Sequence, residues 1–307
     1  HYKKALSAHE EIFGDQINDF EKAVYSRKLG EIYFRRGEHD KALEAFKKAF
    51  GLLGLAYPFT RWKTRVVILR QVCRQCFHRM GFFFYKNRAA VTKSSDFDTE
   101  VARIFESMAW IDLFINQERM ALDIIFALNF AEKIHNIDKM IQTYAGFGFL
   151  MDTLGLFSIA GYYHNLSKRF ITPDTEDHTL AYASLCMAAH LDYTGYWDQA
   201  MLLYKKAAAL FEKIGHIKKW GSPVSLMVFI HNHRGEFEKI REYGRELKKI
   251  GVESGDRQLQ GWGLGAKAIL KMRTGQLEEA ARDLEQSKIL LESIPDYYAL
   301  IANHVDL

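Results

Sequence analysis

The side chains that could do chemistry are few, and their spacing rarely suits a site. Cys73 and Cys76 form a lone Cys-x-x-Cys pair. A zinc or redox site of that kind needs a second ligand pair or a βαβ setting, and the sequence offers neither. His231 and His233 stand two residues apart, so a helix points them to different sides, whereas a two-histidine metal site favours a spacing of three or four. We interpret all four as ordinary helix residues.

Two other patterns are typical of helix packing. Cys186 and His190 have the spacing of one helix face, but no third ligand is visible, so we interpret them as a buried helix pair. The glycine-rich run 261–265 follows no strand, which argues against a dinucleotide-binding fingerprint. The sequence also contains no Gly-x-x-x-x-Gly-Lys-Ser/Thr loop. It therefore predicts no catalytic residue, no metal and no cofactor in this chain.

The composition indicates which elements must carry these residues. Of 307 residues, 48% are hydrophobic, which excludes a disordered chain, and only 4 are proline, which favours long uninterrupted helices. Three cysteines cannot form a disulfide framework, so we expect a cytoplasmic protein. The net charge of +4 is too small to make the whole chain a nucleic-acid binder.

One stretch is long and apolar enough to raise the question of a membrane span. Residues 144–163 contain a single charged residue, Asp152, together with four glycines. We expect two buried helices joined at Gly155 and no membrane span. Neither end shows the pattern of a signal peptide. Helical periodicity is already under way in residues 1–14 and stops within 296–307, so we expect a fragment of a longer protein.

A short signal recurs along the chain: a glycine, a mostly polar stretch, and a small or aliphatic residue five positions later. A glycine in the left-handed conformation ends one helix, and the small residue lets the next helix pack closely. The marks are Gly37, a degenerate copy near Phe77, Asn116, Gly155, Gly195, Gly235 and Gly275, and the last four are 40 residues apart. Stacked hairpins of this kind predict an all-α solenoid that forms one domain over 1–307. The prolines are expected between hairpins, at Pro58, Pro173, Pro223 and Pro295.

The first repeat resembles the tetratricopeptide consensus. The matching residues are Leu29, Gly30, Tyr33, Gly37, Ala42, Phe46 and Ala49. The order of the longer repeats resembles the regulatory tetratricopeptide region of large signalling ATPases linked to adenylyl/guanylyl cyclase or Ser/Thr kinase domains, and the related module of maltose-type activators. The stretches that carry this resemblance are 61–80, 120–134, 195–215 and 275–294. It implies a right-handed superhelix, with nucleotide-binding and catalytic domains outside this chain.

In such arrays the first helix of each hairpin lines a concave groove, and the resemblance implies which side chains face it. The groove candidates are Arg103, Glu106, Gln142, Asp152, Tyr182, Asp192, Asn232, His233, Trp262 and Arg273. This mixture of aromatic and hydrogen-bonding groups suits a protein or peptide segment, or a small effector. Because aromatic residues also pack between repeats, the polar members are the stronger candidates.

The charge is unevenly distributed along the chain. Residues 45–95 contain no aspartate or glutamate and eleven lysines and arginines, so the rest of the chain is net negative. The basic segment includes Arg61, Lys63, Arg65, Arg70, Arg74 and Arg79. It could be a solvated helix face whose acidic partners lie nearby in the fold, or a docking face for an acidic domain or partner. Phosphate binding and a membrane-surface helix are less favoured.

These observations favour a regulatory or sensor module that binds a protein, a peptide or a small effector and acts on neighbouring domains of an ATP-dependent signalling protein. We expect no enzyme activity in this chain, whereas the resemblance leaves a cyclase, ATPase or kinase activity open for the full-length protein. One alternative is a nucleic-acid or transcription-regulator module that uses the basic segment 61–79. Another is a part of an adenylyl/guanylyl cyclase whose catalytic domain lies outside this chain.

Overall fold

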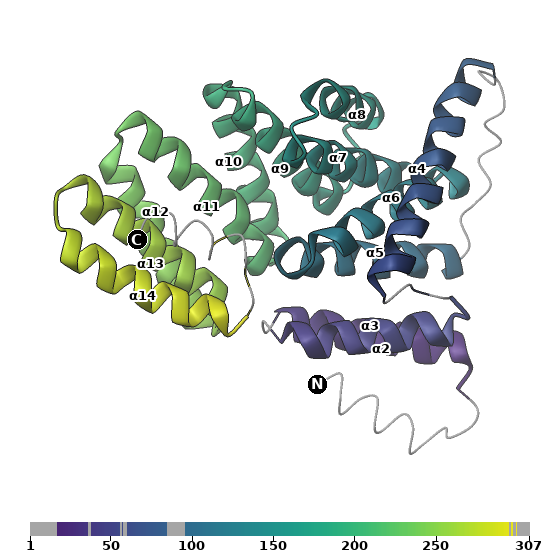
Figure 1. The fold of residues 1–307 in the computed structure, drawn as a ribbon, viewed down its shortest axis with the longest axis horizontal. Coiled ribbons are helices and arrows are strands. Elements are labelled where there is room, and N and C mark those ends of the chain that lie inside the picture. Colours follow the sequence, from purple (N-terminus) through teal and green to yellow (C-terminus); the bar gives the residue numbers. More distant parts are fainter. Residues whose placement is uncertain are drawn as a thin grey trace. The chain divides into compact units, whose positions relative to one another are not determined.

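The computed structural model describes residues 17–35, 38–55, 57, 60–84, 96–294, 296 and 299. Within these residues the chain forms thirteen helices and no strand (Figure 1). The all-α class predicted from the sparse prolines and the helical periodicity is therefore confirmed. Among the described helices, none combines the length and the apolar character needed to cross a bilayer.

The chain divides into two compact units, 1–143 and 144–307, where the sequence predicted one continuous array. In unit 1, α2 packs on α3, α5 packs on α6, and α4 packs on α6. Its core contains large, fully buried side chains such as Phe46, Phe50 and Ile111. The helices that contribute to unit 1 are α2 (Asp19–Arg35), α3 (His39–Leu52), α4 (Arg61–Phe84), α5 (Asp96–Ile115), α6 (Gln117–Ile134) and the first part of α7 (Ile137–Thr153).

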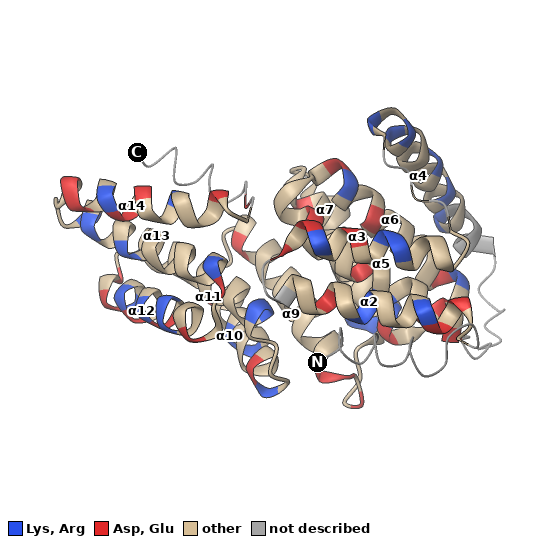
Figure 2. Cartoon of the chain, turned by 90° about the horizontal axis from the view of Figure 1, so that it is seen from below, with Lys and Arg blue, Asp and Glu red and all other residues tan. Residues whose placement is uncertain are grey.

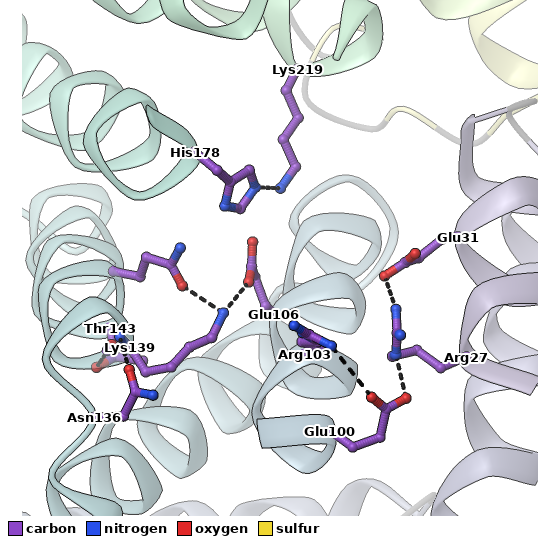
Figure 3. A network of polar contacts seen from close by, with 11 residues as sticks. Arg27, Glu31, Glu100, Arg103, Glu106, Asn136, Lys139, Thr143, His178 and Lys219 are labelled. Atoms are coloured by element: carbon purple, nitrogen blue, oxygen red, sulfur yellow. Dashed lines mark hydrogen bonds and ion pairs between the residues drawn. The ribbon is translucent and has the colours of Figure 1, made fainter. Parts of the chain in front are cut away.

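A buried ion pair joins α2 to α5 within unit 1. The side chains of Arg27 and Glu100 are 5% and 4% exposed, and the Arg27 guanidinium bonds both Glu100 and Glu31 (Figure 3). A charge this far from water is costly unless it is paired. The pair therefore fixes the position of α2 on α5.

Unit 2 continues with helices that each pack on the next one in the chain. The packed neighbours run from α8 on α9 to α13 on α14, and α11 also contacts α13. The helices are α8 (Phe157–Phe170), α9 (Asp177–Tyr193), α10 (Trp197–Lys213), α11 (Ile217–Arg234), α12 (Phe237–Ser254), α13 (Arg257–Arg273) and α14 (Leu277–Glu292). Residues 144–163 accordingly form parts of two helices that meet at Gly155, as the sequence predicted.

The repeat marks of unit 2 lie at the ends of helices. Gly155, Gly195, Gly235 and Gly275 all have a left-handed φ, between +71° and +83°. Five residues after each glycine stand Ala160, Ala200, Ile240 and Ala280, which are at most 1% exposed. Gly215 and Gly255 are also left-handed, at +68° and +71°, and they mark the half-repeat between the predicted glycines. A left-handed glycine thus closes most helices of unit 2, and a small or aliphatic residue is buried five positions after each of the four predicted glycines.

Some of the predicted marks have other roles. Asn116 follows α5 without a left-handed φ: its φ is −158°, and it caps the start of α6, where its Oδ1 accepts a hydrogen bond from the Arg119 N–H at 3.0 Å. Phe77 lies inside α4, where the helix continues without a turn. Pro223 lies inside α11, so the expectation that it separates two hairpins is wrong. Gly37, Pro58 and Pro295 lie outside the described residues.

Candidate functional site

The helix that carries the basic segment, α4, packs on α6 through a polar face. Thr64, Gln71 and Gln75 are 3%, 8% and 3% exposed and recur at helical spacing. From α6, the Asn129 side-chain amide donates to the backbone and side-chain oxygens of Gln71, both at 2.9 Å. Polar groups normally form the outward face of such a helix. In α4 they face the protein instead.

Two glutamates of α6 pair with part of the basic segment. Arg65 bonds Glu118 at 2.6 Å, and Arg61 lies 3.7 Å from the same carboxylate. The hydrogen bond from Arg65 lowers the pKa of Glu118. At the other end of the helix, Glu132 pairs with Arg79. Acidic partners therefore lie nearby for three of the six basic residues: Arg61, Arg65 and Arg79.

The opposite face of α4 is apolar and exposed. Trp62, Val66, Leu69 and Phe77 follow one another at helical spacing, and they are 75%, 49%, 65% and 68% exposed. Exposed cysteines lie on the same helix, at Cys73 and Cys76. Three exposed cations lie beside the stripe, Lys63, Arg70 and Arg74, and no ion pair is found for them in the described part of the chain. We call the apolar stripe and these three cations the α4 outer face. Figure 2 shows α4 with basic residues along its length and no acidic residue.

The groove candidates of unit 1 form polar contacts within the unit (Figure 3). Lys139 donates from Nζ to Glu106 at 3.0 Å and to Gln142 at 2.9 Å. Gln142 is only 4% exposed. The side chain of Arg103 is half exposed and lies 3.8 Å from Glu100. Of these candidates, Arg103 presents the most surface to a ligand.

Three groove candidates of unit 2 lie on neighbouring helices. Asn232 on α11 accepts a hydrogen bond from the Arg273 guanidinium of α13 at 2.9 Å. The ring of His233 stacks on Trp197 with centroids 5.6 Å apart and planes inclined by 10°. His233 and Arg273 are exposed, and Asn232 is partly exposed. The structure therefore brings Asn232 and Arg273 together and leaves His233 and Arg273 exposed to solvent.

The remaining candidates of unit 2 are held by packing. The Trp262 indole N–H donates to the buried Asp296 carboxylate at 2.9 Å. Asp192 accepts a hydrogen bond from the Tyr204 hydroxyl at 3.3 Å, and burial raises the pKa of the Asp192 carboxyl. The hydroxyl of Tyr182 fills the space that a side chain at position 146 would occupy. Each of these side chains therefore has a structural role within unit 2.

Asp152, another groove candidate, is buried beside two histidines of unit 2. Its Oδ2 lies 2.9 Å from His164 Nε2, and its Oδ1 lies 2.7 Å from His190 Nδ1. The carboxylate is fully buried, whereas the side chains of His164 and His190 are 6% and 20% exposed. Burial lowers the pKa of His164, although the Asp152 carboxylate opposes that shift. The cluster gathers one oxygen and two nitrogen ligand atoms within 4.8 Å of one another.

The sequence did not reveal this cluster, because its members are 12 and 38 residues from Asp152 and lie on three helices. The signal that could have found it is the pair of helical glycines, Gly148 and Gly161. A Cβ at position 148 would lie 2.7 Å from the His164 ring, and one at position 161 would lie 3.5 Å from His190 Nε2. A glycine opposite a histidine on a neighbouring helix marks a place where a ring enters the helix interface.

Comparison with protein-family models finds no match to the chain, and comparison with curated protein sequences finds no significant relative. The resemblance to tetratricopeptide arrays thus depends on the residues quoted above. Gly30, one of those residues, packs against Phe46, another: a Cβ at position 30 would lie 2.6 Å from the Phe46 ring.

Proposed function

We propose that this chain is a non-catalytic binding module that docks an acidic, amphipathic helix of a partner protein or domain on the α4 outer face. The observation that carries this proposal is the inverted polarity of α4. Its polar face is buried against α6, and its apolar stripe is exposed to solvent. A contiguous exposed apolar stripe with polar neighbours is typical of a protein interaction surface.

The exposure of the stripe suits a contact with the apolar face of a partner helix. Burying one large apolar side chain completely contributes about 1.5–3 kcal/mol. Trp62, Leu69 and Phe77 each retain about two thirds or more of their exposure, so most of this free energy is still available to a partner. Aromatic side chains such as Trp62 are also common among the residues that dominate binding energy.

The positive charge around the stripe favours an acidic partner. Lys63, Arg70 and Arg74 flank the apolar residues, and α4 carries no acidic residue. Opposite charge speeds association and suppresses wrong partners. A nucleic acid is less favoured, because Glu118 and Glu132 already pair with part of the basic segment and the exposed ridge is apolar.

The wider context follows from the resemblance to regulatory tetratricopeptide regions. On that basis we propose a helical solenoid that transmits partner or effector binding to a nucleotide-dependent signalling domain of a longer protein. The exposed groups around Asn232, His233 and Arg273 are a second contact surface for the same partner or for a small effector.

A designed peptide tests the docking proposal. The probe is a fluorescent peptide with leucines on one helical face and glutamates elsewhere, and the control peptide has the same composition in a scrambled order. Fluorescence anisotropy is measured for the wild type, for Leu69→Ser, and for the matched control Leu202→Ser, whose leucine is 70% exposed on α10. We expect about tenfold weaker binding for Leu69→Ser and no change for Leu202→Ser.

Two results contradict the proposal. One is equal affinity of Leu69→Ser and the wild type for the acidic peptide. The other is that the peptide does not bind while a single-stranded oligonucleotide binds with a steep salt dependence, which would favour a nucleic-acid module.

A further inference from the structure

Three helices of unit 2 bring metal-ligating atoms to one point. Asp152 comes from α7, His164 from α8 and His190 from α9. The carboxylate bridges the two imidazoles, with contacts of 2.9 Å and 2.7 Å to its two oxygens. The two rings lie with centroids 4.9 Å apart, inclined by 44°. Each of the three helices thus contributes one potential metal ligand to the same point.

The polar balance of this cluster is incomplete. The Asp152 carboxylate is fully buried, and among the described residues its ion-pair partners are the two histidines, with no lysine or arginine. Buried polar groups are nearly always satisfied, and a buried carboxylate is costly without a stable positive partner. A cation at the centre would supply that partner.

The helix packing is shaped to admit the rings. The space that the His164 ring occupies exists because residue 148 has no side chain: a Cβ there would lie within 2.7–2.9 Å of three ring atoms. His190 is 20% exposed in its side chain, so the cluster has a side that is open to solvent. The helices thus leave room for two imidazole rings beside one carboxylate, and one of the two rings is partly exposed.

We propose that Asp152, His164 and His190 bind a divalent transition-metal ion, with Zn²⁺ as the expected occupant. Two imidazole nitrogens and one carboxylate oxygen are a ligand set that zinc accepts, with bonds of about 2.0–2.2 Å. Tetrahedral ligand atoms at such bond lengths lie about 3.3 Å apart, whereas each imidazole nitrogen now contacts its own carboxylate oxygen, at 2.9 Å and 2.7 Å, so the side chains must move apart to admit the ion. The open side leaves a fourth position for water. The ion would tie α7, α8 and α9 together.

The test uses the whole chain and Zn²⁺ itself. Cys73→Ser and Cys76→Ser are introduced first, because these exposed thiols could bind zinc independently. Isothermal titration calorimetry then compares this background with His190→Gln and Asp152→Asn. The matched control is His231→Gln, which alters another buried histidine beside a carboxylate, that of Glu236, with no third ligand in the described part of the chain.

We expect one zinc ion per chain in the background variant and in His231→Gln. We expect affinity at least tenfold lower in His190→Gln and Asp152→Asn. The visible absorption of Co²⁺ in place of Zn²⁺ should show tetrahedral coordination and should disappear in the same two variants. Zinc should also raise the melting temperature of the background and not that of His190→Gln.

Three outcomes overturn the proposal: no saturable zinc binding by the background, the same affinity in Asp152→Asn, or an equal loss in His231→Gln. If Asp152→Asn does not fold, His190→Gln decides the question, because His190 is the most exposed of the three ligands.

Discussion

Alanine in place of Gly148 should displace the His164 ring and destabilise unit 2. A Cβ at this position meets three ring atoms at 2.7, 2.8 and 2.9 Å, closer than side chains tolerate. Overpacking of this kind costs about 1–3 kcal/mol. Loss of the hydrogen bond between His164 and the charged Asp152 adds about 1.5–3 kcal/mol. Higher helix propensity returns about 1 kcal/mol, so we expect a net loss of about 1.5–5 kcal/mol.

Gly161→Ala is the matched control for this change. It is the same substitution, in the helix that follows, opposite the other histidine of the cluster. Its Cβ would lie 3.5 Å from His190 Nε2, an ordinary van der Waals contact. Because no clash offsets the gain in helix propensity, we expect Gly161→Ala to be stabilising by about 0.5–1 kcal/mol.

The assay is urea unfolding of the whole chain, followed by circular dichroism and by hydrogen exchange of amides in α7, α8 and α9. The exchange measurement locates the change within unit 2, which a global signal from two units cannot do. Equal stability of Gly148→Ala and the wild type, or the same effect from both alanines, would refute this account of the histidine cluster.

Three further predictions concern other contacts. Burial and the negative charge of Asp112 raise the pKa of Asp123, so the folded state retains a proton that the unfolded chain releases near pH 4. The stability that the protonated Asp123 contributes is lost as the pH rises toward its folded pKa. Urea titrations between pH 4 and 8 should therefore show the free energy of unfolding of Asp123→Asn rising relative to that of the wild type, by up to about 1.4 kcal/mol per pH unit. The same pH dependence in both proteins would contradict this. Glu100→Gln leaves the Arg27 charge with one carboxylate instead of two. Urea titrations should show a loss in the free energy of unfolding at the lower end of the range of about 3–5 kcal/mol. An unchanged urea midpoint would contradict this prediction. Trp262→Phe removes an indole N–H that bonds a buried carboxylate and should cost about 1–3 kcal/mol by the same titration, whereas a neutral effect would mean that the bond is replaced.

The helical class and the repeat period of unit 2 could be predicted because they depend on local chemistry. A left-handed φ favours glycine, and Gly155, Gly195, Gly235 and Gly275 all have one. The expectation failed at Pro223, because the pattern alone does not show that α11 continues past it. Proline is usually excluded from a helix interior, but an individual helix can tolerate the loss of one N–H.

The candidate sites were less predictable, because they depend on contacts between distant residues. The basic segment was visible as composition, but its pairing with Glu118 and Glu132 depends on how α4 packs on α6. An amphipathic helix usually packs through its apolar face, whereas the structure buries the polar face of α4. The histidine cluster required three helices to meet, which no spacing along the chain records.

The most direct test of the proposed function measures whether a partner covers the α4 outer face. Cys73 and Cys76 are exposed on α4, whereas Cys186 is buried and has its thiol pKa raised to about 12 by burial, so maleimide reports α4 selectively. Mass spectrometry follows labelling of each cysteine with the acidic amphipathic peptide or with its scrambled control. The docking account predicts that the acidic peptide slows labelling of Cys73 and Cys76 and that the control does not. Unchanged labelling at a peptide concentration that saturates the anisotropy signal would contradict it, because the peptide would then be bound elsewhere.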